Sequence, residues 1–112
     1  MLRDNASIRD IYNSGKIVLK FAKSLSRKDL GLDESNTAGI ILHIMIIGEA
    51  TKRLSSEFRA QHPKIPWKQM AGIRDVIAHQ YDEIDFDLMW DVIQVSIPDM
   101  LKKIEPLLPD GE

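Results

Sequence analysis

The sequence predicts an all-α protein, and three observations support this fold class. Apolar residues recur at intervals of three and four along most of the 112 residues, which is the spacing of one helix face. No segment alternates apolar and polar residues over a sustained run, and no Asn-Gly or Asp-Gly turn joins two such runs. Hydrophobic residues make up 44% of the chain, which is enough for the core of one domain spanning residues 1–112.

The composition narrows the function. The chain has no cysteine, which excludes disulfides, thiolate catalysis and cysteine-based zinc sites, and fits a reducing cytoplasm. The net charge of −2 argues against a general nucleic-acid binder but permits an enzyme that contacts RNA locally. The N-terminus has no apolar signal region. The longest apolar stretch, residues 38–47, has about half the length of a membrane span, so we expect no membrane contact.

The first predicted helix covers residues 4–25, and Asp4 or Asn5 can cap its start. Its apolar face consists of Ile8, Ile11, Tyr12, Gly15, Val18, Leu19, Ala22 and Leu25. A second periodic set forms a basic stripe of Lys16, Lys20, Lys23 and Arg27. This stripe is either an ordinary solvated face or a rail that follows RNA phosphates beside an active site.

The second predicted helix covers residues 37–61 and has two characters. Its first half, residues 39–47, is apolar on nearly every side, so we expect part of it to pack against a second copy of the chain. Its second half is amphipathic. His43 is predicted to be a core or interface histidine. Glu49 is either a buried carboxylate that anchors Arg74 or a backbone amide, or a side chain that reaches solvent.

Two prolines mark the start of the third predicted helix. Pro63 ends the second helix, and Pro66 fits the first turn of a short helix that leads into residues 73–81. The last predicted helix covers residues 86–104, where Pro98 should produce a kink. The tail from about residue 106 is expected to be poorly ordered.

Four acidic residues fall between positions 82 and 87. They could suggest a cation site, but a helix cap by Asp85, with Asp87 in the first turn, explains them more simply. The sequence offers no obvious metal site, and no cofactor is expected.

The segment 73–81 brings an arginine, a histidine and a tyrosine together. Arg74 presents a planar fork of donors suited to phosphate oxygens. His79 can accept or donate a proton near neutral pH, and Tyr81 offers a hydroxyl. Phosphodiester cleavage in RNA needs these groups, because the 2′-hydroxyl loses a proton, the leaving oxygen gains one, and charge builds on the phosphoryl oxygens.

Helical geometry constrains this site. On a continuous helix Arg74 and His79 would lie about 140° apart. Either the helix ends near Ala78, or the same motif of a second chain completes the site. Asp75 could bind His79 and fix its tautomer. A structural alternative is that the arginine, histidine and tyrosine form only an ion pair and a cap at a helix end.

Residues 74–81 and their surroundings resemble a known family. The run Arg74-Asp75-Val76-Ile77-Ala78-His79-Gln80-Tyr81 is similar to the R-x4-H-x-Y motif of HEPN-domain ribonucleases. The surrounding residues resemble the HepT toxin branch in order and spacing. These are Ile47-Gly48-Glu49-Ala50, Leu54-Ser55, Pro63-Lys64-Ile65-Pro66-Trp67, Gly72-Ile73, Trp90 and Ile97-Pro98-Asp99-Met100-Leu101.

The resemblance implies an up-down four-helix HEPN-like bundle with a short extra helix, dimerising through the bundle. It implies a metal-independent RNA endonuclease, the toxin of a type VII toxin–antitoxin pair. Arg74 would hold the scissile phosphate, His79 would act as acid or base, and Tyr81 would support RNA binding. An MntA-type nucleotidyltransferase antitoxin would neutralise the toxin by transferring AMP to Tyr81, with Asp75 and Glu49 in supporting positions.

Two other functions remain open from the sequence. The chain could be a non-catalytic helical dimer that serves as a nucleotide-binding or adaptor module for a nucleotidyltransferase. It could also be a purely structural dimerisation domain, in which Arg74 and His79 have no chemical role.

Overall fold

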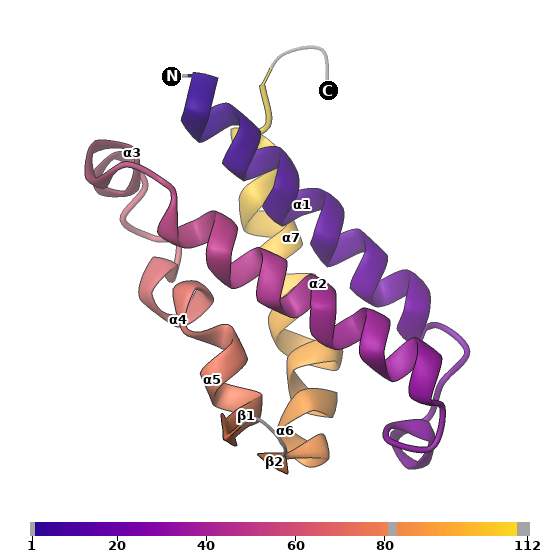
Figure 1. Cartoon of the computed structure of the whole chain (residues 1–112). Helices are drawn as coiled ribbons and strands as arrows, with labels where there is room; N and C mark the ends of the chain where they lie inside the picture. The colour runs from indigo at the N-terminus through magenta and orange to yellow at the C-terminus, as the bar shows by residue number, and fades with distance from the viewer. Residues whose placement is uncertain (1, 81–82, 110–112) are drawn as a thin grey trace.

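Two long helices, α1 (Leu2–Ala22) and α2 (Glu34–Lys52), run antiparallel and side by side along one face of the molecule (Figure 1). The computed structural model describes residues 2–80 and 83–109, and for residues 2 and 78–80 the backbone alone. Between the two helices lies a short 3₁₀ turn, Arg27–Asp29. The Asp33 side chain caps α2 by accepting a hydrogen bond from the Asn36 backbone N–H at 3.1 Å.

Three short helices follow: α3 (Ser56–Gln61), α4 (Trp67–Ala71) and α5 (Ile73–Ile77). The Trp67 indole N–H anchors the connection between α3 and α4. It donates to the carbonyl oxygens of Arg59 and His62, at 3.2 and 3.0 Å. Pro66 immediately precedes α4, as its fixed backbone angle predicts. α3 lies beyond the end of α2, and α4 and α5 then run back along α2 (Figure 1).

The third layer lies behind α1 and α2 and consists of one long, irregular helical run (Figure 1). It comprises α6 (Phe86–Asp91), a π-helical turn (Val92–Ser96), α7 (Ile97–Ile104) and a 3₁₀ turn (Glu105–Leu107). The π-helical turn ends at Ser96, two residues before Pro98, and the kink predicted at Pro98 stays a prediction. A wider turn suits the position because proline lacks the N–H that an α-helix would use.

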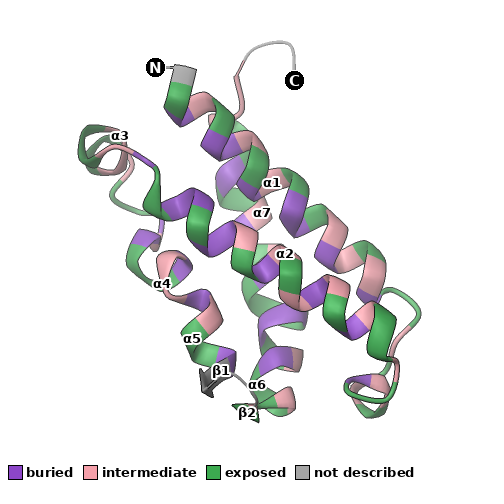
Figure 2. Ribbon diagram, viewed as in Figure 1, coloured by how far each residue is buried: buried purple, intermediate pink, exposed green. Residues whose placement is uncertain are grey.

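The core is built from the apolar stripes that the sequence predicts. Fully buried side chains come from each long element, among them Ile8, Ile11, Ile44, Ile47 and Ile97. Figure 2 shows buried and exposed segments alternating along α1 and α2, which is the pattern of helices that bury one side. The predicted all-α class is confirmed, because periodic apolar burial fixes the three helical layers.

One short strand pair departs from a purely helical chain. β1 (Ala78–Gln80) and β2 (Glu83–Ile84) pair antiparallel directly after α5. No alternation of apolar and polar residues signals such a short pair in the sequence.

The predicted second helix, residues 37–61, is wrong as a single element. α2 ends at Lys52. The Ser55 hydroxyl then caps α3 by accepting a hydrogen bond from the Phe58 N–H at 3.0 Å. The Asp4 carboxylate holds this break, since it accepts from the Ser55 backbone N–H at 2.8 Å and from its hydroxyl at 2.9 Å. Asp4 therefore does not act as the predicted cap of α1; it joins α1 to the start of α3.

The ends of the predicted helices also shift. α1 stops at Ala22 instead of residue 25. Glu105–Leu107 form a 3₁₀ turn after α7, and Leu107 and Leu108 pack against the core.

The Asp4–Ser55 link predicts a pH-dependent contribution to stability. The Ser55 backbone N–H and hydroxyl hold the pKa of Asp4 below its ordinary value of 3.8, although burial opposes them. Because the folded pKa is depressed, the carboxylate stabilises the fold fully above the ordinary value, and this contribution is lost as the pH falls through the folded pKa. We expect Asp4→Ala to lower the free energy of unfolding by about 1.5–3 kcal/mol at neutral pH.

Thermal melts of Asp4→Ala and of the unmutated chain, recorded from neutral pH down to acid, test this expectation. The difference between them should shrink as the pH falls below about 4. The exposed carboxylate Asp91, on α6, provides the matched control Asp91→Ala. A difference between the Asp4 variant and the parent that stays constant across the pH range would show that the carboxylate's charge is not what matters.

Candidate active site

Arg74 is positioned by the burial of its neighbours on α5. Ile73 and Ile77 face the interior and are 6% and 1% exposed. Their packing fixes how α5 sits against α2, and Arg74 consequently lies at the edge between the two helices. The Arg74 side chain remains 39% exposed, so its guanidinium can reach a ligand in solvent.

A glycine on α2 allows the short helices to approach closely. A Cβ atom at Gly48 would lie 3.2 Å from the Ala71 carbonyl oxygen and 3.7 Å from the Ile73 Cγ2 atom. Few real side chains tolerate so close a backbone oxygen. The absence of a side chain at Gly48 thus lets the junction of α4 and α5 rest against α2.

A cleft of about 250 Å³ opens between these elements. One wall consists of Met45, Gly48, Glu49 and Lys52 from α2, and the other of Ala71, Arg74 and Asp75 from α4 and α5. Arg74 therefore lines an open cleft between α2 and α5. We take it as the candidate active site and call it the Arg74 cleft.

The charged side chains of the cleft are paired loosely. The Arg74 Nη1 atom lies 3.4 Å from the Asp75 Oδ1 atom, and the Lys52 Nζ atom lies 3.5 Å from the Glu49 Oε1 atom. Glu49 is 66% exposed, so of the two alternatives the structure takes the one in which this carboxylate reaches solvent. It does not anchor Arg74, although both line the same cleft. Exposed pairs of this kind contribute little stability and leave the cations available to a ligand.

The chain stops being helical just before His79. α5 ends at Ile77, whose carbonyl oxygen accepts a hydrogen bond from the Asp85 N–H at 2.8 Å. The continuous helix that would separate Arg74 and His79 by about 140° is therefore absent. In the strand pair that follows, Ala78 is opposite Ile84 and Gln80 is opposite Glu83, so His79 is the extra residue of a bulge. Bulges are frequent beside active sites, where they redirect the chain.

The prediction that the helix ends near Ala78 is confirmed. The structure describes only the backbone of His79, and Tyr81 lies outside the described residues. The proposed contact of Asp75 with His79 and the roles of His79 and Tyr81 therefore remain predictions.

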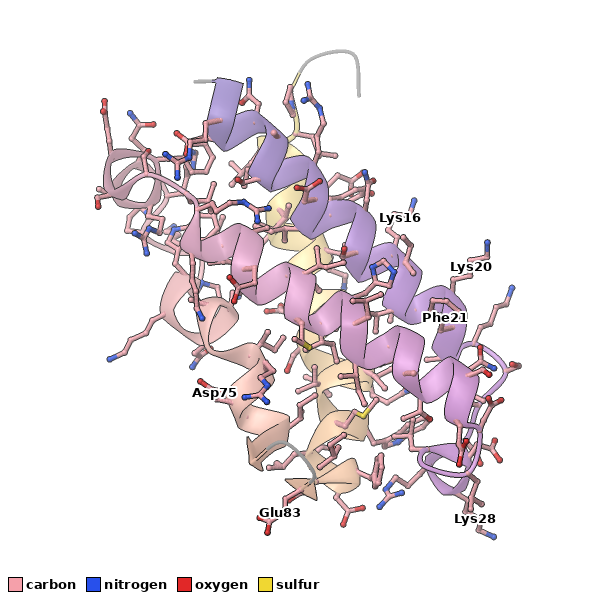
Figure 3. The ribbon with its side chains drawn as sticks, viewed as in Figure 1. Lys16, Lys20, Phe21, Lys28, Asp75 and Glu83 are labelled. Atoms are coloured by element: carbon pink, nitrogen blue, oxygen red, sulfur yellow. The ribbon has the colours of Figure 1, made fainter. Side chains whose placement is uncertain are left out.

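The predicted basic stripe does not border the Arg74 cleft within one chain. Lys16 and Lys20 project from α1, while Asp75 lies on α5 with α2 between them (Figure 3). Lys23 follows the end of α1, and Arg27 lies in the 3₁₀ turn, where its Nε atom bonds the Asp87 Oδ1 atom at 2.6 Å. The sequence spacing predicted that the four cations would share one helix face. In the structure α1 ends at Ala22, so Lys23 and Arg27 do not continue that face.

Other predicted residues have structural roles. The Asp85 side chain accepts from the backbone N–H groups of Asp87 and Leu88, both at 3.1 Å, which confirms the helix cap. His43 is half-buried between α1 and α2, with its Nδ1 atom 3.1 Å from the Ser14 hydroxyl. Within residues 2–80 and 83–109, no three acidic or histidine side chains gather in a way that could hold a metal ion.

Sequence reasoning missed Lys52 as a member of the site. Its position four residues after Gly48 was the available signal, because residues one helical turn apart share a face. A second omission is Met45, which is 43% exposed and lies next to Leu42, itself 54% exposed, on the same side of α2. The cleft therefore has an apolar end at Met45 and a basic end at Lys52.

An all-α bundle of HEPN-like class, with an arginine-lined cleft at the end of a short helix, is what the fold and the site define. The chain belongs to the HepT-like ribonuclease family, whose model, "Ribonuclease HepT-like", matches residues 11–107.

Relatives support this assignment over most of the chain. "Putative RNase TTE0752" of Caldanaerobacter subterraneus is 33% identical over 101 residues, which are 90% of this chain and 90% of that protein. "Putative RNase MJ0127" of Methanocaldococcus jannaschii is 31% identical over 96% of this chain and 88% of its own length. "Probable ribonuclease HepT" of Thermococcus cleftensis is 31% identical over 89% of this chain and 91% of its own length. No solved structure matches the chain.

Within the described residues, no helix combines the length and the apolar composition that a membrane span requires.

The close approach at Gly48 can be tested by adding one methyl group. Gly48→Ala gains about 0.5–1 kcal/mol of helix propensity, but overpacking against a backbone carbonyl costs about 1–3 kcal/mol. We therefore expect a net loss of up to about 2 kcal/mol in urea unfolding. The matched control is Gly72→Ala, where the nearest atom to an added Cβ is a carbonyl oxygen at an ordinary 3.7 Å. A Gly48→Ala protein more stable than the parent would remove this constraint.

Proposed function

We propose that this protein is an RNA endonuclease toxin that cleaves RNA without a metal ion, using Arg74 and His79 as the catalytic pair. The observation that carries the proposal is the placement of Arg74 in an open cleft at the end of α5, three residues before the helix stops. The relatives named as ribonucleases and the family match support RNA as the substrate.

The chemistry assigned to these residues is a transesterification. The ribose 2′-oxygen attacks the adjacent phosphorus, the bond to the 5′-oxygen of the next nucleotide breaks, and a 2′,3′-cyclic phosphate forms. His79 takes the proton from the 2′-hydroxyl or gives one to the departing 5′-oxygen. Arg74 binds the non-bridging oxygens, where negative charge grows as the new bond forms. Tyr81 assists RNA binding.

A second copy of the chain is part of the proposal. Leu42 and Met45 are 54% and 43% exposed on α2, which makes an apolar surface at the Met45 end of the Arg74 cleft. A homodimer formed through this surface would bring two R-x4-H-x-Y motifs together. Sedimentation of Leu42→Glu tests it: the charge should yield a monomer, and an unchanged dimer would place the interface elsewhere.

The proposed regulation acts on Tyr81. An MntA-type nucleotidyltransferase antitoxin would transfer AMP from ATP to the tyrosine. The phenolic oxygen attacks the α-phosphorus of ATP, the phenol loses its proton, and pyrophosphate leaves. The added phosphate and nucleoside would put negative charge and bulk where RNA must bind, which blocks cleavage.

Arg74→Ala and His79→Ala should each lower RNA cleavage about 100-fold or more, because they remove charge stabilisation and proton transfer respectively. Cleavage by the unmutated protein should persist with a chelator present. Lys68→Ala, an exposed cation on the neighbouring α4, serves as the matched control. Light scattering should show the same assembly for all four proteins. Full cleavage by both variants would support the adaptor function instead, in which these residues bind the antitoxin or a nucleotide.

Incubation with ATP and an MntA-type nucleotidyltransferase should add the mass of adenylyl groups to Tyr81. The chain has two tyrosines, so Tyr12→Phe is a matched control that should still be modified, whereas Tyr81→Phe should not. Peptide mass spectrometry locates the group, and the RNA cleavage rate measures its effect. Complete neutralisation with Tyr81 unmodified would mean that the antitoxin inhibits by binding alone.

A further inference from the structure

A second cleft adjoins the Arg74 cleft at the break between α2 and α3. It has a volume of about 340 Å³ and is lined by Arg3, Asp4, Lys52, Arg53, Leu54, Ser55 and Ser56. Lys52 lines both clefts, so its side chain lies where the two clefts adjoin at the end of α2. Lys52 stands four residues, about 6 Å along the helix axis, beyond Gly48, the residue beside which α5 approaches α2.

The two sides of these neighbouring clefts, at Met45 and beyond Lys52, differ in chemistry. At the Met45 end the neighbouring Leu42 is exposed and apolar, which suits another protein surface. At the opposite end three cations, Arg3, Lys52 and Arg53, surround the polar groups of Ser55 and Ser56. Of these two sides, a polyanion that fills the Arg74 cleft therefore finds favourable charge past Lys52 and not at Leu42.

The carboxylates at this end leave the cations accessible. Both Asp4 oxygens already accept hydrogen bonds from Ser55. The Arg53 Nη2 atom lies 3.2 Å from the Asp10 Oδ2 atom, but the two side chains are 48% and 52% exposed. Lys52 is 58% exposed beside Glu49. Solvent screens such pairs strongly, and phosphate oxygens can replace one carboxylate partner with little loss.

We propose that single-stranded RNA leaves the Arg74 cleft across Lys52, and that Lys52, Arg53 and Arg3 bind its backbone phosphates next to the scissile one. This inference rests on the proposed ribonuclease function and names the direction in which the substrate runs. The subsite contacts phosphates and not bases, so it contributes affinity without sequence preference. Glu49 weakens the subsite, because its carboxylate competes with RNA for Lys52.

The experiment measures binding of a short fluorescein-labelled single-stranded RNA of mixed sequence by anisotropy. All proteins carry His79→Ala so that the probe stays intact. Changing Lys52 and Arg53 together to glutamine should raise the Kd about tenfold. It should also flatten the plot of log Kd against log salt by about 0.7 per lost phosphate contact.

The matched control is the pair Lys16→Gln and Lys20→Gln, which removes the same charge from the outer side of α1 (Figure 3). Its Kd should change less than twofold. Both pairs are exposed, and thermal melts confirm that each variant is folded. A Kd that rises for the Lys16 and Lys20 pair but not for the Lys52 and Arg53 pair would overturn the proposed direction.

Glu49→Gln gives a change of opposite sign. It should tighten RNA binding two- to threefold, because Lys52 loses its competing partner; equal or weaker binding contradicts the subsite. Cleavage by proteins with His79 intact separates the two levels of the argument. If the unmutated protein cuts RNA while the Lys52 and Arg53 change affects neither binding nor cutting, only the subsite is wrong. If it neither binds nor cuts RNA, the ribonuclease proposal fails and the subsite with it.

Discussion

The contact between Gly48 and the junction of α4 and α5 is the constraint on which the Arg74 cleft depends. A helix and a backbone turn can approach this closely only where the helix lacks a side chain, and an added Cβ would lie 3.2 Å from the Ala71 carbonyl oxygen. The approach carries Ile73 into the core and leaves Arg74 at the rim. A helix pair held farther apart would let water between the walls and separate Arg74 from Lys52, so one backbone contact sets both the depth and the lining of the cleft.

Two hydrogen-bonded links complete the frame around this contact. Asp4 binds the Ser55 N–H and hydroxyl, which stops α2 at Lys52 and turns the chain into α3. The Asp85 N–H binds the Ile77 carbonyl, which stops α5 and sends the chain into β1. Asp4 thus binds the residue that caps the start of α3, and the Asp85 N–H binds a carbonyl oxygen at the end of α5. Polar groups at a partly buried helix end need such partners. The two ends flank the proposed RNA path.

These links also explain how far sequence reasoning could reach. Apolar periodicity predicted α1, the first part of α2 and the last helical run, because burial of one face dominates their energetics. The same periodicity wrongly extended α2 through residues 53–55. Nothing local to that segment reveals that Asp4, on α1, accepts a hydrogen bond from the Ser55 N–H and so ends the helix. The break after Ile77 was inferable only as one of two alternatives, from the angle between Arg74 and His79. The spacing from Gly48 put Lys52 on the right face of α2, but only the packing of α5 against α2 shows that this face borders the Arg74 cleft.

The two halves of α2 differ in character, and each suits one of the two proposed partners, a second chain and RNA. Residues 39–47 are apolar on nearly all sides, and Ile40, Ile44 and Ile47 satisfy only the inner face. Leu42 and Met45 remain outside, where a second chain would cover them. Past Gly48 the same outer stripe changes to Glu49 and Lys52, which a protein core could not accept but a phosphate backbone could. A net charge of −2 is then no obstacle to RNA binding, since the substrate would meet only the basic end of one helix and the arginine held beside it.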